Sequence, residues 1–315
     1  MKKILLASLL FVVCAPVHSQ TFPSKTVRRI SGVSPGAASD TMARVLAEKL
    51  SASLGQSVIV ENRLGAGGVV AAKYVAGAEP DGHVISVYTS AFTIAPILNP
   101  GTIDPAELMP VAMLGTVPTV LVTQPGKFKT LAELVAAAKA KPGALVAANA
   151  GIGSSTHMNM ERFSAAAGLS FLNLPMKGPS EALTEVVAGR ADLYFAPVFS
   201  AEKFVQEGRL VALAVGSPKR SSLFPNLPTT VEAGYPNSDY NFWIGALVSA
   251  RTPPAIVQRL NREFNAALQL PDIREQMKKL GVEPFPQTLP EFEAMIKKEL
   301  EENAQLVKAA GIKPN

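Results

Sequence analysis

Strand-like and helix-like patterns of apolar residues alternate along the first third of the chain. The segments 26–33, 56–62 and 83–89 are rich in β-branched residues, which favour extended backbone. Between them, 41–55 and 69–78 carry apolar residues at helical spacing. A β-α-β-α-β order predicts a parallel sheet with right-handed crossovers.

The same alternation returns after residue 116 and ends in a different way. It predicts strands at 117–123, 144–150, 169–175, 191–197 and 210–216, with helices at 131–141, 154–168 and 179–189 between them. Residues 217–240 contain four prolines and no helical period, which is typical of a linker. A strand at 241–249 and helices near 254–269, 272–280 and 289–309 complete the chain.

These elements predict two α/β domains, each a mainly parallel sheet flanked by helices. We assign 20–123 and 217–315, with the C-terminal helices, to domain 1, and 124–216 to domain 2. Ligands of open parallel sheets lie beyond the carboxyl ends of the strands. Two such edges that face each other would form a ligand cleft between the domains.

The N-terminus has the layout of a secretory signal peptide, residues 1–19. Lys2 and Lys3 precede an apolar run that is too short to span a membrane, and the small residues Val17 and Ser19 precede Gln20. We predict cleavage after Ser19 and an exported mature protein that is not embedded in the membrane. Cys14, the only cysteine, follows the bulky Val13, which argues against a lipid anchor.

Composition excludes several classes of function. The mature chain would have 315 − 19 = 296 residues, and its net charge falls from +5 to +3 once Lys2 and Lys3 are removed. Its basic residues are scattered, whereas nucleic-acid binding needs them clustered on one face. The three histidines lack metal-ligand spacing. We therefore expect no nucleic acid, no metal and no cofactor.

Two loops between a strand and a helix favour an anion. SPGAASD ends in Ser39 and Asp40, either of which is a candidate N-cap, and in NAGIGSST two glycines precede Ser154. Free N–H groups and the helix dipole at such points favour a carboxylate or a phosphate. Ordinary glycine turns with helix caps explain the same residues equally well. If the second loop binds an anion, Gly153→Asp should abolish binding and leave the fold largely intact.

Nearly the whole mature chain resembles the extracytoplasmic receptors of tripartite tricarboxylate transporters, also called Bug-type receptors. The similarity lies in SPGAASDTMARVLAEKLSASLGQSVIVENRLGAGG, AEPDGHVISV, ANAGIGSSTHM, MKGPSEALTEVVAGRADLYFAP, LPTTVEAGYP and NFWIGALVSARTPPAIVQRLN, which occur in the family order. The resemblance implies a periplasmic-binding-protein-like fold and a two-domain receptor, located in the periplasm, that closes on a small organic carboxylate. We expect the mature protein to be a monomer. It also implies delivery of that ligand to the membrane permease subunits of a tripartite transporter.

The resemblance also implies where the ligand binds. Carried onto this sequence, the binding positions are Pro35, Gly36, Ala37, Ser39, Asp40, Thr89, Ser90, Gly153, Ser154, Ser155, Thr156, Lys177, Gly178, Ala196 and Pro197.

The chain departs from the family pattern at two of these positions. Ala37 stands where a second glycine is usual, and Ala196 stands where the strand commonly ends in an acidic residue. An amine-bearing ligand would need that negative charge, which favours a carboxylate without an amino group.

Two other functions remain open at this stage. An exported α/β hydrolase-like enzyme would use Ser154 or His157, but a nucleophile needs a base and an orienting group, and the sequence shows no catalytic constellation. A binding protein that signals to a sensor protein is the other alternative.

Overall fold

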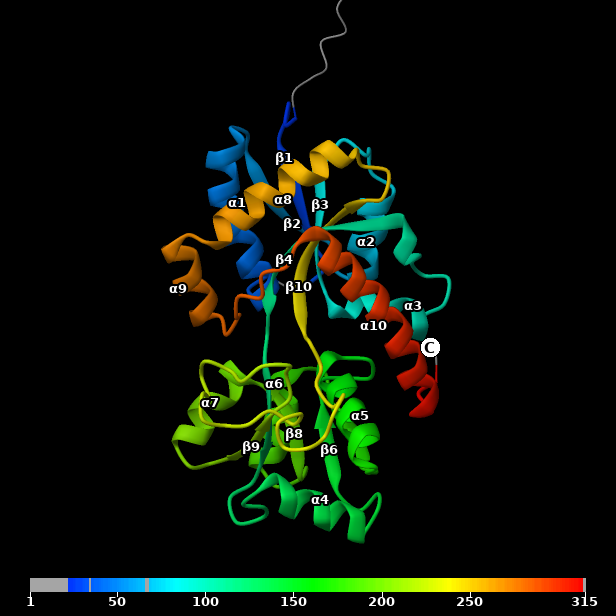
Figure 1. Ribbon diagram of the computed structural model, residues 1–315, viewed down its shortest axis with the longest axis vertical. Helices are drawn as coiled ribbons and strands as arrows, with labels where there is room; N and C mark the ends of the chain where they lie inside the picture. The colour runs from blue at the N-terminus through cyan, green and yellow to red at the C-terminus, as the bar shows by residue number, and fades with distance from the viewer. Residues whose placement is uncertain (1–21, 34, 66–67, 314–315) are drawn as a thin grey trace, which may run out of the picture.

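The computed structural model describes residues 22–33, 35–65 and 68–313, and the predicted signal peptide and its cleavage site lie outside them. The described chain forms two lobes, each a five-stranded sheet with helices on both faces (Figure 1). None of the helices in the described ranges is long and apolar enough to cross a membrane.

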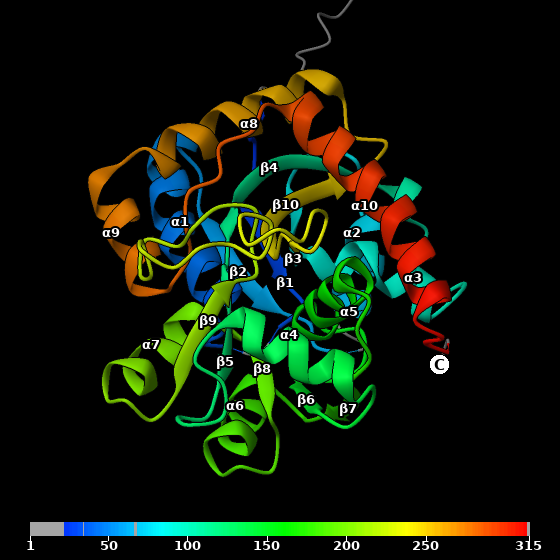
Figure 2. The same cartoon turned by 60° about the horizontal axis from the view of Figure 1, so that its bottom comes forward.

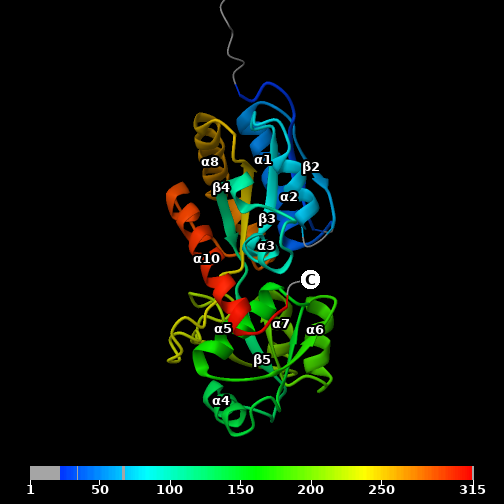
Figure 3. The same cartoon turned by 90° about the vertical axis from the view of Figure 1, so that its right-hand side faces the viewer.

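The first lobe is built on the sheet β2-β1-β3-β10-β4. Helices α1 and α8 share one apolar core with this sheet, and α2 and α10 share a second core on the opposite face (Figure 3). The elements are β1 (Val27–Ser31), α1 (Ala38–Leu54), β2 (Val58–Asn62), α2 (Val69–Ala76), β3 (Val84–Thr89), α3 (Ala95–Leu98), β4 (Leu108–Thr116), β10 (Trp243–Ser249), α8 (Pro254–Leu268), α9 (Pro271–Lys279) and α10 (Leu289–Ala309), with 3₁₀ turns at Ser90–Thr93 and Pro105–Glu107.

Helix α1 shows how sequence spacing produces this packing. Met42, Leu46 and Leu50 recur every four residues, lie on one face and are buried. Gly55 ends the helix in the left-handed conformation, with φ 69°, and its N–H bonds to the oxygen of Ser51.

The second lobe is built on the sheet β7-β6-β8-β5-β9. Helices α4 and α5 share a core with one face, and α6 and α7 share a core with the other (Figure 2). The elements are β5 (Thr119–Thr123), α4 (Leu131–Ala140), β6 (Val146–Asn149), α5 (Ser155–Ala167), β7 (Leu172–Pro175), α6 (Pro179–Val187), β8 (Leu193–Pro197), α7 (Val198–Gln206) and β9 (Val211–Val215).

Both sheets are mainly parallel, as predicted, and each contains one reversed strand. β10 runs antiparallel to both β3 and β4, and β5 runs antiparallel to both β8 and β9. The two lobes therefore share one strand order, and each sheet is completed by a strand that the chain reaches when it crosses between the lobes.

The crossings lie at other positions than the sequence pattern predicts. β5, which the pattern assigns to domain 1, pairs within the second sheet. The segment after Gly216 also stays with the second lobe, because Thr230 N–H bonds to Val215 O and Tyr240 N–H bonds to Gly216 O. The chain thus crosses next to Val117 and again next to Phe242, where Val117 N–H donates to Phe242 O at 2.7 Å.

The C-terminal helices pack on the first lobe. α8 lies against α1 and β4, and α9 lies against α1. The end of α10 also reaches α5 of the second lobe (Figures 1 and 2), where Arg162 forms an ion pair with Glu302 at 2.9 Å. This helix therefore links the two lobes outside the crossing strands.

Candidate functional site

The loops that follow the parallel strands of the two lobes meet at the junction between them. Gly153 follows β6, and a Cβ added there would overlap Leu98 of α3 and lie 3.6 Å from Ile94, which follows β3. These apolar residues belong to one buried cluster with Met158, Tyr240 and Val307, which draws on both lobes. The carboxyl-end loops of β3 and β6 are thus in contact.

The first predicted loop is shaped by Asp40, which is not the N-cap that the sequence suggested. Ala37 occupies that position without a side-chain cap, and Ser39 lies buried within α1. Asp40 is fully buried and accepts hydrogen bonds from Gly36 N–H, from Arg44 and from Asn62. Its carboxylate holds the loop closed and is fully used inside the protein.

The charge of Asp40 is stabilised by those partners. Burial alone would raise the pKa of its carboxyl group, but the hydrogen bonds from Arg44, Asn62 and Gly36 outweigh burial and lower that pKa. Pro35 and Gly36 are exposed at the tip of the loop, and the φ of Gly36 is 87°. The loop therefore presents backbone groups, and its one carboxylate is occupied.

Thr89 and Ser90 lie where β3 turns into the 3₁₀ helix. Thr89 Oγ1 accepts from Ala91 N–H at 3.4 Å, and Ser90 is buried. The oxygen of Ser90 accepts from Thr93 Oγ1 at 2.8 Å. These two residues shape the segment that carries Ile94 and Leu98 toward the second lobe.

The loop 150–156 of the second lobe is held by its own side chains. Ala150 N–H donates to Thr156 Oγ1 at 3.0 Å. Ser154 caps α5 through a bond from His157 N–H to its Oγ, and that Oγ lies 3.1 Å from Thr156 Oγ1. Gly153 N–H donates to His157 Nδ1 at 3.1 Å.

The N-terminus of α5 is the part of this loop that suits an anion. The N–H groups of Ser155 and Thr156 belong to the first turn, where helices lack internal acceptors, and no bond from either is found among the described residues. The helix dipole adds partial positive charge at the same point. The N–H groups of Ser155 and Thr156 are therefore available as hydrogen-bond donors at the N-terminus of α5, as the sequence predicted.

Gly153 itself is more constrained than the sequence suggested. Its φ is 73°, which residues other than glycine rarely adopt, and its Cα faces Leu98 of the other lobe. Gly153→Asp would therefore strain the backbone and disturb the contact between the lobes. The expectation that this substitution spares the fold is therefore wrong, whereas the expected loss of binding stays a prediction.

The remaining predicted positions differ from one another in their surroundings. Lys177 is exposed and precedes Gly178, the N-cap of α6. Ala196 and Pro197 are buried at the end of β8, and α7 begins at once with Val198. Among the described residues, no hydrogen bond or ion pair joins Lys177 or Ala196 to the loops of the first lobe.

The donors around this junction are mostly uncharged. Among the predicted site residues the only acidic side chain is Asp40, which is saturated, and the only basic one is Lys177, which is exposed. In the described ranges, no cluster of three or more His, Cys, Asp or Glu side chains is arranged to hold a metal ion. The site is therefore suited to hydrogen-bond recognition of an anion.

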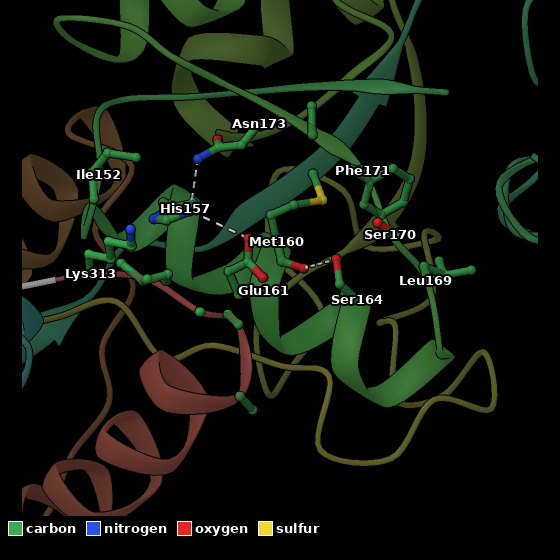
Figure 4. A pocket seen from close by; sticks show the side chains of 15 residues that line it. Ile152, His157, Met160, Glu161, Ser164, Leu169, Ser170, Phe171, Asn173 and Lys313 are labelled. Carbon is green, nitrogen blue, oxygen red and sulfur yellow. Dashed lines mark hydrogen bonds and ion pairs between the residues drawn. The ribbon is translucent and has the colours of Figure 1, made fainter. Parts of the chain in front are cut away.

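A pocket of about 600 Å³ opens behind α5 (Figure 4). Its lining includes His157, Glu161 and Asn173 of the second lobe and Ala309–Lys313 at the end of α10. It lies on the side of the loop 150–156 where the His157 ring is packed. Sequence reasoning did not predict this pocket.

Several supporting residues were also missed. Arg44 and Asn62 donate hydrogen bonds to Asp40. Asn149 donates a hydrogen bond to Asn173, whose side-chain amide contacts the ring of His157. The i,i+4 spacing of Asp40 and Arg44 was a readable signal of their pairing. The asparagine partners come from separate strands and carry no comparable signal in the sequence.

Comparisons with known proteins agree with this architecture. A family model described as the tripartite tricarboxylate transporter family receptor matches residues 42–312. The protein BugT of Bordetella pertussis is 35% identical over 308 residues, which cover 96% of this chain and 94% of BugT.

Solved structures extend the comparison to three dimensions. An R. palustris protein solved with adipate is 27% identical with a TM-score of 0.78, covering 93% of this chain and 100% of that one. MatC from Rhodopseudomonas palustris with bound malate is 29% identical with a TM-score of 0.74, covering 91% of this chain and 100% of MatC. Because the family model matches most of its length, this chain belongs to the tripartite tricarboxylate transporter receptor family, the Bug-type receptors.

Proposed function

We propose that this protein is a periplasmic receptor that binds a small organic carboxylate between its lobes and delivers it to the membrane permease of a tripartite transporter. The observation that carries the proposal is the N-terminus of α5. Its unpaired N–H groups lie in a loop that contacts the other lobe. The neighbours solved with malate and adipate support the same class of ligand.

The ligand that we propose is a mono- or dicarboxylate without an amino group. An ammonium group needs a free carboxylate partner when it is taken out of water. Asp40 is committed to Arg44 and Asn62, and the end of β8 carries Ala196. The binding positions Pro35–Asp40, Thr89–Ser90, Gly153–Thr156, Lys177–Gly178 and Ala196–Pro197 remain part of this proposal.

We further propose that the bound acid is released unchanged. A serine nucleophile needs an imidazole base within hydrogen-bonding reach. Ser154 Oγ is instead the acceptor of the backbone N–H of His157, while the Nδ1 atom of the ring accepts from Gly153. These bonds describe a helix cap and a packed ring, which supports binding over hydrolysis.

A thermal-shift screen tests the ligand class directly. The panel contains malate, adipate, succinate and citrate, with aspartate and glutamate as matched amino acids. A ligand at 100 times its dissociation constant stabilises the folded protein by about 2.7 kcal/mol. We expect shifts with one or more of the plain acids and none with the amino acids. Shifts confined to the amino acids would contradict the proposal.

Mass spectrometry tests whether the acid is released unchanged, and sedimentation tests whether the protein is a monomer. We expect the acid to be recovered unchanged after prolonged incubation with the protein, and the protein to sediment as a monomer. A cell that lacks the receptor should lose uptake of the acid identified in the screen while its permease is still present.

A further inference from the structure

Helix α5 carries a buried asparagine one turn beyond its proposed anion-binding end. Asn159 is fully buried and follows Ser155 and Thr156 of the first turn. The helix lies beside the segment that leads into β10 (Figure 1). A buried amide needs hydrogen-bond partners for its oxygen and for its NH₂ group. The identity of these partners shows what the side chain holds together.

The oxygen of Asn159 binds the first crossing between the lobes. Thr119 lies two residues after Val117, at the start of β5, and is also buried. Its hydroxyl donates to Asn159 Oδ1. The start of β5 is therefore attached to α5 at the point where the chain enters the second lobe.

The NH₂ group of Asn159 binds the second crossing. Nδ2 donates to Gly216 O at 3.1 Å and lies 3.5 Å from Ser238 O. Gly216 O also accepts Tyr240 N–H at 2.9 Å, two residues before Phe242, where the chain returns to the first lobe. Carbonyl oxygens only accept, so this side of the amide is the NH₂ group. One side chain thus binds both segments through which the chain passes between the lobes.

Gly216 leaves the space that this amide occupies. A Cβ added at Gly216 would overlap Asn159 Oδ1 and lie 2.6 Å from Thr119 Oγ1. Any larger residue there would displace the amide from its partners. The close approach of backbone and side chain therefore depends on glycine at this position.

We propose that Asn159 is a positioning residue that fixes both crossing segments to the ligand-binding helix. The second lobe then moves as one body as far as Thr119 and Tyr240, and bending is confined to the few residues next to Val117 and Phe242. A ligand held at the N-terminus of α5 turns the crossing segments together with the helix, which couples capture to closure. This inference rests on the proposed function, because α5 is its binding element.

The loss of the amide should weaken binding through the orientation of the lobes. When the crossing segments are no longer attached to α5, the two lobes adopt the binding orientation for a smaller fraction of the time. The apparent affinity falls in proportion to that fraction. Asn159 therefore acts on the ligand through the position of α5 and needs no contact with it.

Three substitutions separate this role from packing. Asn159→Leu has nearly the same shape and no polar group, and Thr119→Val removes only the hydroxyl that binds Asn159. Thr123→Val is the matched control. Thr123 lies at the other end of the same strand, is also buried and donates its hydroxyl to Asp192 O at 2.8 Å. Its substitution removes one buried hydrogen bond from the second lobe, away from the crossings.

The first experiment needs no ligand and follows the hydrogen exchange of backbone amides by NMR. The Gly216 and Tyr240 amides report on the crossing segments, and the amides of β6 and β8 report on the core of the second sheet. One neutral hydrogen bond corresponds to roughly threefold to tenfold in a local opening equilibrium. Relative to β6 and β8, we expect Asn159→Leu to accelerate exchange by that factor at both reporters, Thr119→Val to do so at Gly216, and Thr123→Val at neither. Equal acceleration throughout the second sheet, or none at Tyr240 in Asn159→Leu, would overturn the proposal.

The second experiment measures affinity by calorimetry with malate and adipate as probes. We expect Asn159→Leu and Thr119→Val to weaken the binding of an acid that binds the wild type by roughly threefold to tenfold. Thr123→Val should retain the wild-type affinity. Equal affinities of Thr119→Val and Thr123→Val would refute the coupling of the hinge to ligand capture. If neither acid binds the wild type, the proposed ligand class fails, while hydrogen exchange still decides whether Asn159 fixes the crossing segments.

Discussion

Glu299 is a carboxyl group in an environment that favours its neutral form. It is 7% exposed on α10, and its Oε2 accepts Trp243 Nε1–H at 2.8 Å and lies 3.3 Å from Thr93 Oγ1. Thr93 lies 2.8 Å from Ser90 O and accepts from Asn303. The single hydrogen of Thr93 Oγ1 can point to Ser90 O or to Glu299 Oε2. The hydrogen bonds from Trp243 and Thr93 lower the pKa of Glu299, whereas burial raises it.

Burial of Glu299 outweighs its hydrogen bonds, and the resulting pKa predicts a pH effect on stability. Burial raises its pKa to about 7, from 4.5 in the unfolded chain. Between these values the folded protein binds more protons than the unfolded one, so stability falls as pH rises and remains lower above the folded pKa. We expect Glu299→Gln to raise the unfolding free energy near pH 8 by on the order of 3 kcal/mol, measured by urea denaturation across pH.

Glu301→Gln is the control for this measurement, because Glu301 is exposed on the same helix. It should leave the slope of stability against pH unchanged. A wild-type protein whose stability does not fall between about pH 5 and pH 8 would show that Glu299 is ionised in the folded state.

At the scale of elements, the sequence predicted the helices and strands in which the regular spacing of apolar residues is uninterrupted. Helix α10 has the predicted bounds, and α8 differs by one residue. β4 was missed because Pro110 and Gly115 interrupt its pattern. Pro110 is tolerated because β4 is an edge strand. Gly115 has a φ of 152°, and a Cβ there would lie 2.7 Å from Val282. α7 was missed because it follows β8 without a turn residue between them.

The candidate site was predictable only to the level of its loops. Glycine before a serine cap identifies the start of α5 from local chemistry alone. The contact of Gly153 with Leu98 joins separate lobes, and the bond from Asn62 to Asp40 joins separate strands. Such contacts depend on how elements pack in space, which one-dimensional periodicity does not contain.

Helix α10 begins with a capping box that makes a local prediction. Thr288 Oγ1 accepts Glu291 N–H at 3.4 Å, and Glu291 Oε2 accepts Thr288 N–H at 2.8 Å. Thr288→Ala should lower the unfolding free energy by about 1 kcal/mol, as measured by chemical denaturation. Lys297→Ala, on the exposed face of the same helix, should have little effect. Equal stability of the two variants would show that the cap contributes nothing.

At the scale of the whole molecule, two kinds of connection hold the lobes together. The chain crosses twice, next to Val117 and Phe242, and short crossings of this kind can act as a hinge. Side-chain contacts between the lobes, such as Leu98 with the Gly153 loop and Arg162 with Glu302, can separate when the hinge opens. We therefore expect the protein to open and to close on its ligand.

Leu98→Ala tests this view of the junction. Removing a buried leucine side chain within one lobe costs about 2–5 kcal/mol of stability, and Leu134→Ala in the second-lobe core should show that cost. Leu98→Ala should cost less, because the lobes can part, and should increase the radius of gyration in small-angle scattering. The addition of a bound acid should restore compaction. A radius identical to wild type without ligand would contradict the hinge.

The exchange of strands between the lobes has a consequence for how the chain acquires its structure. β10 lies between β3 and β4, so the first sheet stays divided until the chain has been made as far as Ser249. All strands of the second sheet, in contrast, lie between Thr119 and Val215 and are complete earlier. Synthesis starts at the N-terminus, so the strands of the first lobe up to Thr116 lack a finished core while the second lobe folds. The lobe that begins the chain is therefore the last to be completed.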